Sequence, residues 1–97
     1  MSGSEGQVGH LTWVKGGWAS FVVVQDDVVT LRSSIPSPPG SRIDGRLNVE
    51  PAADVRVKIH GSKLEADGTF TLRGRLIDAN RELRDRLAAL AAGTPAT

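Results

Sequence analysis

The sequence predicts a mainly β protein, a six-stranded antiparallel β-barrel, partly or wholly closed, with one C-terminal α-helix. Short runs rich in β-branched residues, separated by glycine, proline and aspartate, occupy most of the chain between residues 10 and 77. Two of these runs, 55–60 and 70–76, alternate between small or apolar and polar residues, which is typical of strands with one buried face. Only the segment after residue 78 spaces its leucines at helical intervals. These patterns favour a small barrel whose helix covers an open end or a flank.

The composition is that of one compact domain that is held by its apolar core. The 97 residues include no cysteine, so no disulfide or thiolate metal site can form, and a reducing compartment is expected. We expect a disordered N-terminal tail over 1–9, the domain over 10–93 and a C-terminal tail over 94–97. The chain start lacks the features of a secretory signal and no apolar run is long enough to span a bilayer, so a cytoplasmic protein is predicted. A net charge of +1 gives no overall attraction to a polyanion.

The first part of the chain is expected to supply three strands. Residues 11–14 form a short strand, which the glycine pair at 16–17 ends. The valine-rich runs 18–24 and 28–32 flank a polar turn and are predicted to pair as a hairpin. Residues 33–41 contain three prolines, which remove backbone donors, so this segment is predicted to be an exposed loop.

The second part of the chain is expected to supply the other three strands. Residues 42–49 alternate weakly and are predicted to form a strand that Pro51 ends. The alternating runs on either side of the turn at 66–68 should pair as a long antiparallel hairpin. Six strands are therefore expected in all.

The long hairpin is predicted to contain a bulge. Strict alternation would place Leu64 on the polar face of its strand. A bulge at residues 61–62, a glycine and a serine, would return Leu64 to the core opposite Phe70 and keep Ile59 opposite Leu76.

The last segment is predicted to be a helix from about residue 79 to residue 91. Asp78 or Asn80 can cap its N-terminus, and Gly93 followed by Pro95 ends it. Leucines at i, i+4 and i+7 form its apolar face: Leu83, Leu87 and Leu90. The expected inward-facing residues of the whole domain are Phe21, Val23, Ile43, Val57, Ile59, Phe70, Leu72, Leu76, Leu83 and Leu87.

The order of these elements resembles that of the PilZ domain family over about residues 18–90. The likeness is carried by the Pro-Pro-Gly loop that leads into a strand and by the closing run Thr-Phe-Thr-Leu-Arg-Gly-Arg-Leu-Ile-Asp-Ala-Asn-Arg-Glu-Leu-Arg-Asp-Arg-Leu at 69–87. The resemblance implies a six-stranded barrel with a C-terminal helix and a non-catalytic role in bacterial cyclic di-GMP signalling.

The family's two ligand-binding motifs are not present at their usual positions. An Arg-x-x-x-Arg precedes the barrel in that family, but here no arginine precedes Arg32 and Lys15 is the only basic residue before it. In the second motif, Asp/Asn-x-Ser-x-x-Gly, either Asp26 or Asp27 fits the acidic position. The serine and glycine positions are occupied by Val28 or Val29 and by Leu31 or Arg32. The resemblance therefore implies a PilZ-like signalling or protein-interaction module, with another signalling protein as partner, no cofactor and no cyclic di-GMP binding in the family's usual way.

Two alternative functions remain open from the sequence. A cyclic di-GMP receptor could use displaced residues, namely Asp26, Asp27, Arg32, Arg42 and Arg46, of which the last two spell the arginine spacing after the proline loop. A nucleic-acid binder could use a basic strand face made of Arg56, Lys58, Arg73 and Arg75, together with His60. This second alternative is disfavoured because single-strand binders place aromatic residues among such charges, and this face has none.

Catalysis is not expected. The two histidines, His10 and His60, lie far apart in the chain, and no nucleophile with an adjacent base or converging metal-ligand set is visible. Trp13 and Trp18 flank a loop and are either core residues or anchors for a partner protein.

Overall fold

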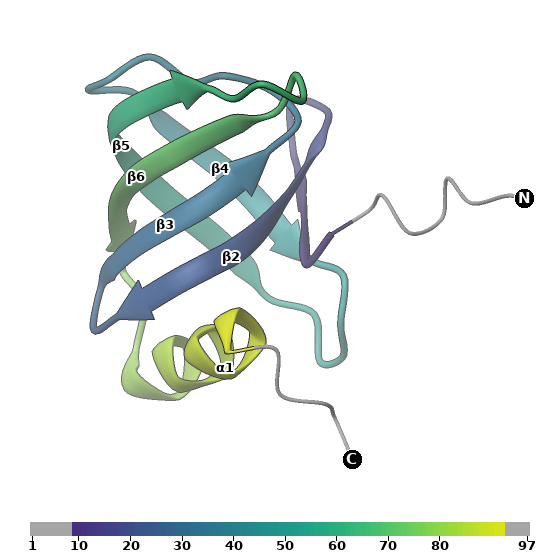
Figure 1. The fold of residues 1–97 in the computed structure, drawn as a ribbon. Coiled ribbons are helices and arrows are strands. Elements are labelled where there is room, and N and C mark those ends of the chain that lie inside the picture. Colours follow the sequence, from purple (N-terminus) through teal and green to yellow (C-terminus); the bar gives the residue numbers. More distant parts are fainter. Residues whose placement is uncertain (1–8, 93–97) are drawn as a thin grey trace, which may run out of the picture.

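The protein folds as a closed six-stranded barrel with a helix across one end (Figure 1). The structure, a computed structural model, describes residues 9–92. The elements are β1 (Leu11–Trp13), β2 (Trp18–Gln25), β3 (Val28–Ser33), β4 (Arg42–Leu47), β5 (Asp54–Leu64), β6 (Phe70–Ile77) and α1 (Arg81–Ala91). Around the barrel the strands follow the order β1-β2-β3-β6-β5-β4, and β1 also pairs with β4. Each neighbouring pair of strands is antiparallel, so the predicted fold class is confirmed.

The barrel interior is filled by the alternate residues of the strands. These inward residues are apolar and buried: Leu11, Trp13, Ala19, Phe21, Val29, Leu31, Ile43, Leu47, Val55, Val57, Ile59, Leu72 and Leu76. Two inward positions carry glycine because larger neighbours occupy the space. A Cβ at Gly45 would lie 2.7 Å from Leu11 Cδ1, and one at Gly74 would collide with the carbonyl oxygen of Lys58.

Most of the predicted inward residues are buried, but Val23 is not. Phe70 and Leu83 are half-buried against the core, whereas Val23 is 50% exposed. The β2–β3 register passes from the pair Phe21 and Leu31 to the pair Val23 and Thr30, so Val22 is an extra residue. This bulge turns two consecutive valines outward, and the inward parity resumes one residue later, at Val24.

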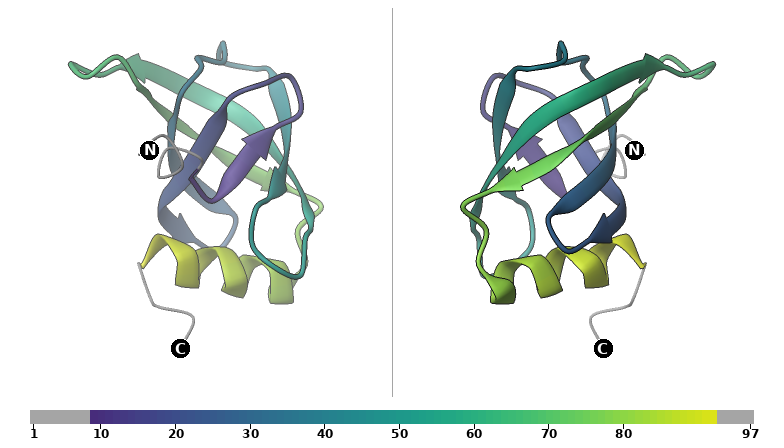
Figure 2. Two further views of the ribbon diagram at one scale, coloured as in Figure 1. Left: turned by 90° about the vertical axis from the view of Figure 1, so that its right-hand side faces the viewer. Right: turned by 90° about the vertical axis from the view of Figure 1, so that its left-hand side faces the viewer.

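The β5–β6 hairpin contains a bulge, as predicted, although the extra residue is His60. The predicted pairing of Leu64 with Phe70 is confirmed, but Ile59 lies opposite Gly74 and not opposite Leu76. The predicted burial of Leu64 is wrong, because Leu64 is 64% exposed. The tip of the β5–β6 hairpin projects beyond the rest of the barrel (Figure 2).

The helix α1 closes the end of the barrel opposite the hairpin tip (Figure 2). It begins after Asn80, whose side-chain oxygen accepts a 2.8 Å hydrogen bond from the Leu83 amide, so Asn80 and not Asp78 is the cap. Leu87 is fully buried and Leu90 is half-buried against the core. The predicted stop at residues 93–95 and most of both predicted tails lie outside the described residues. Within the described residues, α1 is neither long enough nor apolar enough to cross a membrane.

Candidate functional site

A row of cations crosses the outside of the barrel on three neighbouring strands. Arg42 on β4 is the direct partner of Lys58 on β5, which is the direct partner of Arg75 on β6. All three side chains are exposed. We call these three residues the cationic row. Neighbouring strands lie about 4.8 Å apart, so the row spans roughly 10 Å at the Cα level. Arg73, two residues before Arg75, lies on the same outward face of β6.

Little negative charge lies against this row. Asp27 Oδ2, in the β2–β3 turn, lies 3.8 Å from Arg75 Nε. Among the described residues, Arg42, Lys58 and Arg73 form no ion pair. The face therefore has a local excess of positive charge that the net charge of +1 does not indicate.

An apolar patch adjoins the cationic row. Val22, Val23 and Val28 are 48%, 50% and 50% exposed, and we call them the valine patch. Val28 on β3 is the direct partner of Arg75, and Thr30 on the same strand lies between Val23 and Arg73. Exposed aliphatic residues that lie together beside charged residues are typical of a surface that contacts another molecule.

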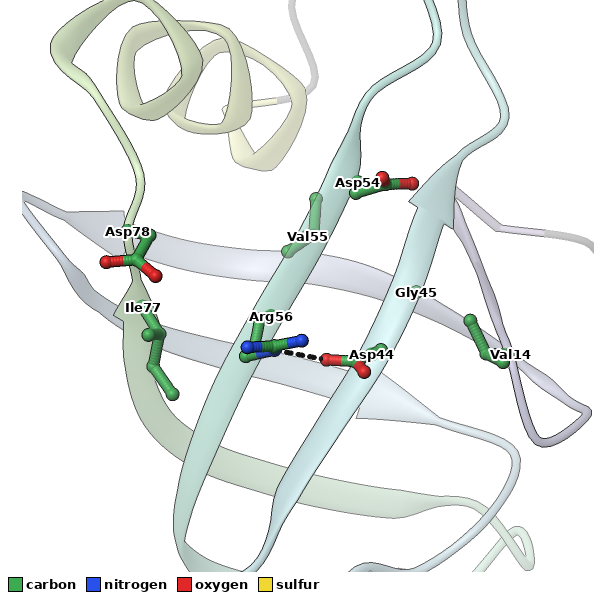
Figure 3. Close-up of a pocket in the computed structure, with 8 residues that line it drawn as sticks. All are labelled: Val14, Asp44, Gly45, Asp54, Val55, Arg56, Ile77 and Asp78. Carbon is green, nitrogen blue, oxygen red and sulfur yellow. Dashed lines mark hydrogen bonds and ion pairs between the residues drawn. The ribbon is translucent and has the colours of Figure 1, made fainter.

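A second candidate is a surface pocket of about 400 Å³ further along the β4–β5 pair (Figure 3). It is lined by Val14, Asp44, Gly45, Asp54, Val55, Arg56, Ile77 and Asp78. Arg56 Nε donates a 2.7 Å hydrogen bond to Asp44 Oδ1, and this bond and the charge of Asp44 raise the pKa of Arg56. Arg46 Nη1 lies 3.2 Å from Asp54 Oδ1.

The polar groups that line this pocket are three carboxylates and one guanidinium. No histidine or hydroxyl nucleophile lines it, and its arginine is already paired with one of its carboxylates. Within residues 9–92 there is no group of three or more side chains that could hold a metal ion. The pocket is therefore a weaker functional candidate than the cationic row.

The residues that a displaced cyclic di-GMP site would need do not converge. Arg32 on β3 pairs with Asp67 at 3.4 Å, whereas Arg42 lies on β4, three strands away around the barrel. Arg46 is four residues along β4 from Arg42, roughly 13 Å, and pairs with a different carboxylate. Asp26 lies in the β2–β3 turn with a positive φ of 56°. Of this set, Arg42 belongs to the cationic row, and Asp27 lies beside Arg75 at the other end of the row.

The predicted basic face is present in altered form. Lys58, Arg73 and Arg75 lie close together, whereas Arg56 lies one step further along β5 and is held by Asp44. His60 is the exposed extra residue of the β5 bulge. Sequence reasoning missed the contribution of Arg42 to this face and the valine patch beside it. The run Val22-Val23-Val24 was the available signal, because three consecutive valines cannot all point inward on a strand with one buried face.

The two tryptophans have different environments. Trp13 is 1% exposed, and its Nε1 donates a 2.9 Å hydrogen bond to the buried Ser33 hydroxyl, so it is a core residue and not a partner anchor. Trp18 is half-buried, and its backbone N–H donates to the Ser34 hydroxyl at 2.9 Å.

His10 has a structural role. Its Nδ1 accepts a 3.0 Å hydrogen bond from the Phe21 amide, and the two rings stack with centroids 6.1 Å apart. Partial burial lowers the pKa of His10, which favours the neutral ring that this hydrogen bond requires. A histidine used in this way is not available as a catalytic base.

Comparisons with known proteins do not assign a family. No family model, no curated protein and no solved structure matches the chain.

Proposed function

We propose that this chain is a non-catalytic PilZ-like signalling and protein-interaction module of the bacterial cytoplasm, which does not bind cyclic di-GMP in the family's usual way. The observation that carries the proposal is the cationic row beside the valine patch, on the outside of a closed barrel. Such a surface binds through charge and apolar contact and needs no reacting group. The six-stranded barrel and its C-terminal helix are also what the PilZ resemblance implies.

The side chains that could bind cyclic di-GMP are far apart on this barrel. The ligand carries two phosphates and two guanines, so tight binding needs arginines that converge on the phosphates and short polar groups that meet a guanine edge. Here Arg32, Arg42 and Arg46 are separated on the barrel surface. Of the two candidates for the motif's glycine position, Leu31 is fully buried in the core.

The expected loss of affinity is large. Each missing bidentate arginine contact is worth about 1.5–3 kcal/mol. Losing two such contacts weakens a micromolar site to roughly millimolar, at about 1.4 kcal/mol per tenfold change in Kd.

Titration of the chain with cyclic di-GMP tests the proposal. Calorimetry measures the affinity, and amide chemical shifts locate the binding site. We expect no saturable binding with a Kd below about 10 µM. Saturable binding below that value that is lost in Arg42→Ala or Arg46→Ala would overturn the proposal and favour a receptor that uses displaced arginines. The matched control is Lys15→Ala, which removes the single cation of the N-terminal segment.

A further inference from the structure

We propose that the cationic row, Arg73 and the valine patch together bind an acidic segment of a partner protein that also carries aliphatic residues. This inference rests on the proposed function and names the docking surface and the chemistry of the partner. The partner's carboxylates would meet β4, β5 and β6, and its aliphatic side chains would cover β3 and β2.

The charge arrangement is the first reason. Lys58 lies directly between Arg42 and Arg75, and like charges placed directly opposite one another in a sheet are destabilising. The one described carboxylate that approaches the row is Asp27, at 3.8 Å from its outer end. Asp44, two residues along β4 from Arg42, is held by Arg56 at 2.7 Å. Carboxylates of a partner would relieve a repulsion that the described part of the chain leaves in place.

The valine patch is the second reason, and it distinguishes a protein from a nucleic acid. The β2 bulge turns Val22 and Val23 outward beside Val28, and each of the three is about half exposed. A sugar-phosphate backbone offers these aliphatic groups no apolar partner, and unpaired bases are held by aromatic side chains, which this face lacks. Aliphatic side chains of a protein segment would cover them and exclude water from the neighbouring ion pairs.

The placement of the charged and apolar side chains is the third reason, because it limits how the partner can bind. Four of the six steps between neighbouring strands separate β4 from β2 by way of β5, β6 and β3, so this surface curves around the closed barrel. A straight helix cannot follow such a surface, whereas an extended segment can. An extended segment of about 16 residues is roughly 53 Å long, which is enough to pass around the barrel. The proposed segment is therefore extended, acidic at one end and aliphatic at the other.

Selection from a displayed library of random peptides of about 16 residues, with the full chain as bait, tests this inference without a known partner. We expect selected peptides to be rich in Asp and Glu toward one end and in Leu, Ile or Val toward the other. Amide shifts caused by one such peptide should fall on the outer residues of β2 to β6. Selection of no peptides, or of peptides with another composition, would overturn the inference.

Charge reversal and matched controls locate the surface. Lys58→Glu should raise the Kd of the selected peptide by about tenfold or more. Lys63→Glu, the same change at the exposed hairpin tip of β5, should raise this Kd by less than about twofold. Val23→Asp should weaken binding, and Val14→Asp, at a 77% exposed valine outside the patch, should not. Equal effects of the two lysine variants, or of the two valine variants, would show binding elsewhere and refute the docking surface. Unfolding midpoints establish that all four variants fold.

An oligothymidylate of about twelve nucleotides serves as the competing probe. Tighter binding of this probe than of the peptide, with loss in Lys58→Glu, would reassign the surface to nucleic acid. The cyclic di-GMP titration gives an independent result. Saturable binding of cyclic di-GMP would contradict the proposed function, whereas failure of the peptide selection alone would contradict only this docking surface.

Discussion

Truncation of Leu87 tests whether α1 is held by its own barrel. Leu87 is 0% exposed and is the fully buried residue of this 11-residue helix. Leu87→Ala removes about three carbon groups, or roughly 2.4 kcal/mol at about 0.8 kcal/mol per methylene. The cavity left behind adds to this loss, so we expect a decrease of about 3–4 kcal/mol in the free energy of unfolding. For a domain of this size, that corresponds to a decrease in Tm of roughly 12–30 °C.

Urea unfolding of the wild type and the variant measures this loss, and amide hydrogen exchange locates it. Protection should decrease most in α1, because a helix of about 11 residues is marginal without packing. Leu90→Ala is the matched control, since Leu90 is only half-buried against the same core and its truncation should cost about half as much. An unchanged midpoint for Leu87→Ala, or equal losses in the two variants, would refute the docking of this face on the barrel.

Three further predictions concern the core and its edge. Gly45→Ala should lower the free energy of unfolding by about 1–3 kcal/mol, because its Cβ would lie 2.7 Å from a core leucine, whereas Gly61→Ala, with nothing within 4 Å, should be tolerated. Ser33→Ala leaves the buried indole N–H of Trp13 without its acceptor and should cost about 1–3 kcal/mol, measured by urea unfolding with tryptophan fluorescence. Because burial lowers the pKa of His10 below 6.5, its contribution to stability is complete above that pH and is lost as the pH falls below it. The urea midpoint should therefore decrease between about pH 7.5 and 5.5 in the wild type and not in His10→Gln.

Each of these predictions has a result that contradicts it. Equal stability of the two glycine variants would mean that the barrel interior relaxes around an added methyl. No loss in Ser33→Ala would mean that the indole finds another acceptor. A wild-type midpoint that does not change over the stated pH range would show that protonation of His10 does not oppose folding.

Strand positions could be predicted where one face of the strand is buried along its whole length. In β5 the residues Val55, Val57 and Ile59 alternate with charged residues, and the structure buries all three. The same reasoning failed at Val23, because a valine run contains no polar residue to reveal a bulge. It also failed for the burial of Leu64, the last residue of β5, because the local pattern gives the face of a residue but not how far the core extends along the strand.

The cationic row could not be predicted from any single strand. Arg42 and Lys58 are 16 residues apart in the chain, and they become neighbours through the β4–β5 register. That register is set by which inward residues fit the barrel, Gly45 and its bulky neighbours among them, and not by the exposed charges. For the same reason, the sequence alone grouped Arg42 with Arg46 on one strand, whereas the structure places Arg42 directly beside Lys58 of β5, with Arg75 of β6 on the far side of that lysine.

The shortest strand determines how the barrel can fail. β1 has 3 residues, Leu11–Trp13, yet it joins β2 to β4 and contributes two buried side chains. Detachment of this strand would open the barrel between β2 and β4. The strand edges exposed in this way are templates for aggregation. Proteolytic removal of the chain up to Val14 would have the same effect. Closure of the barrel therefore depends on a strand that is only 3 residues long.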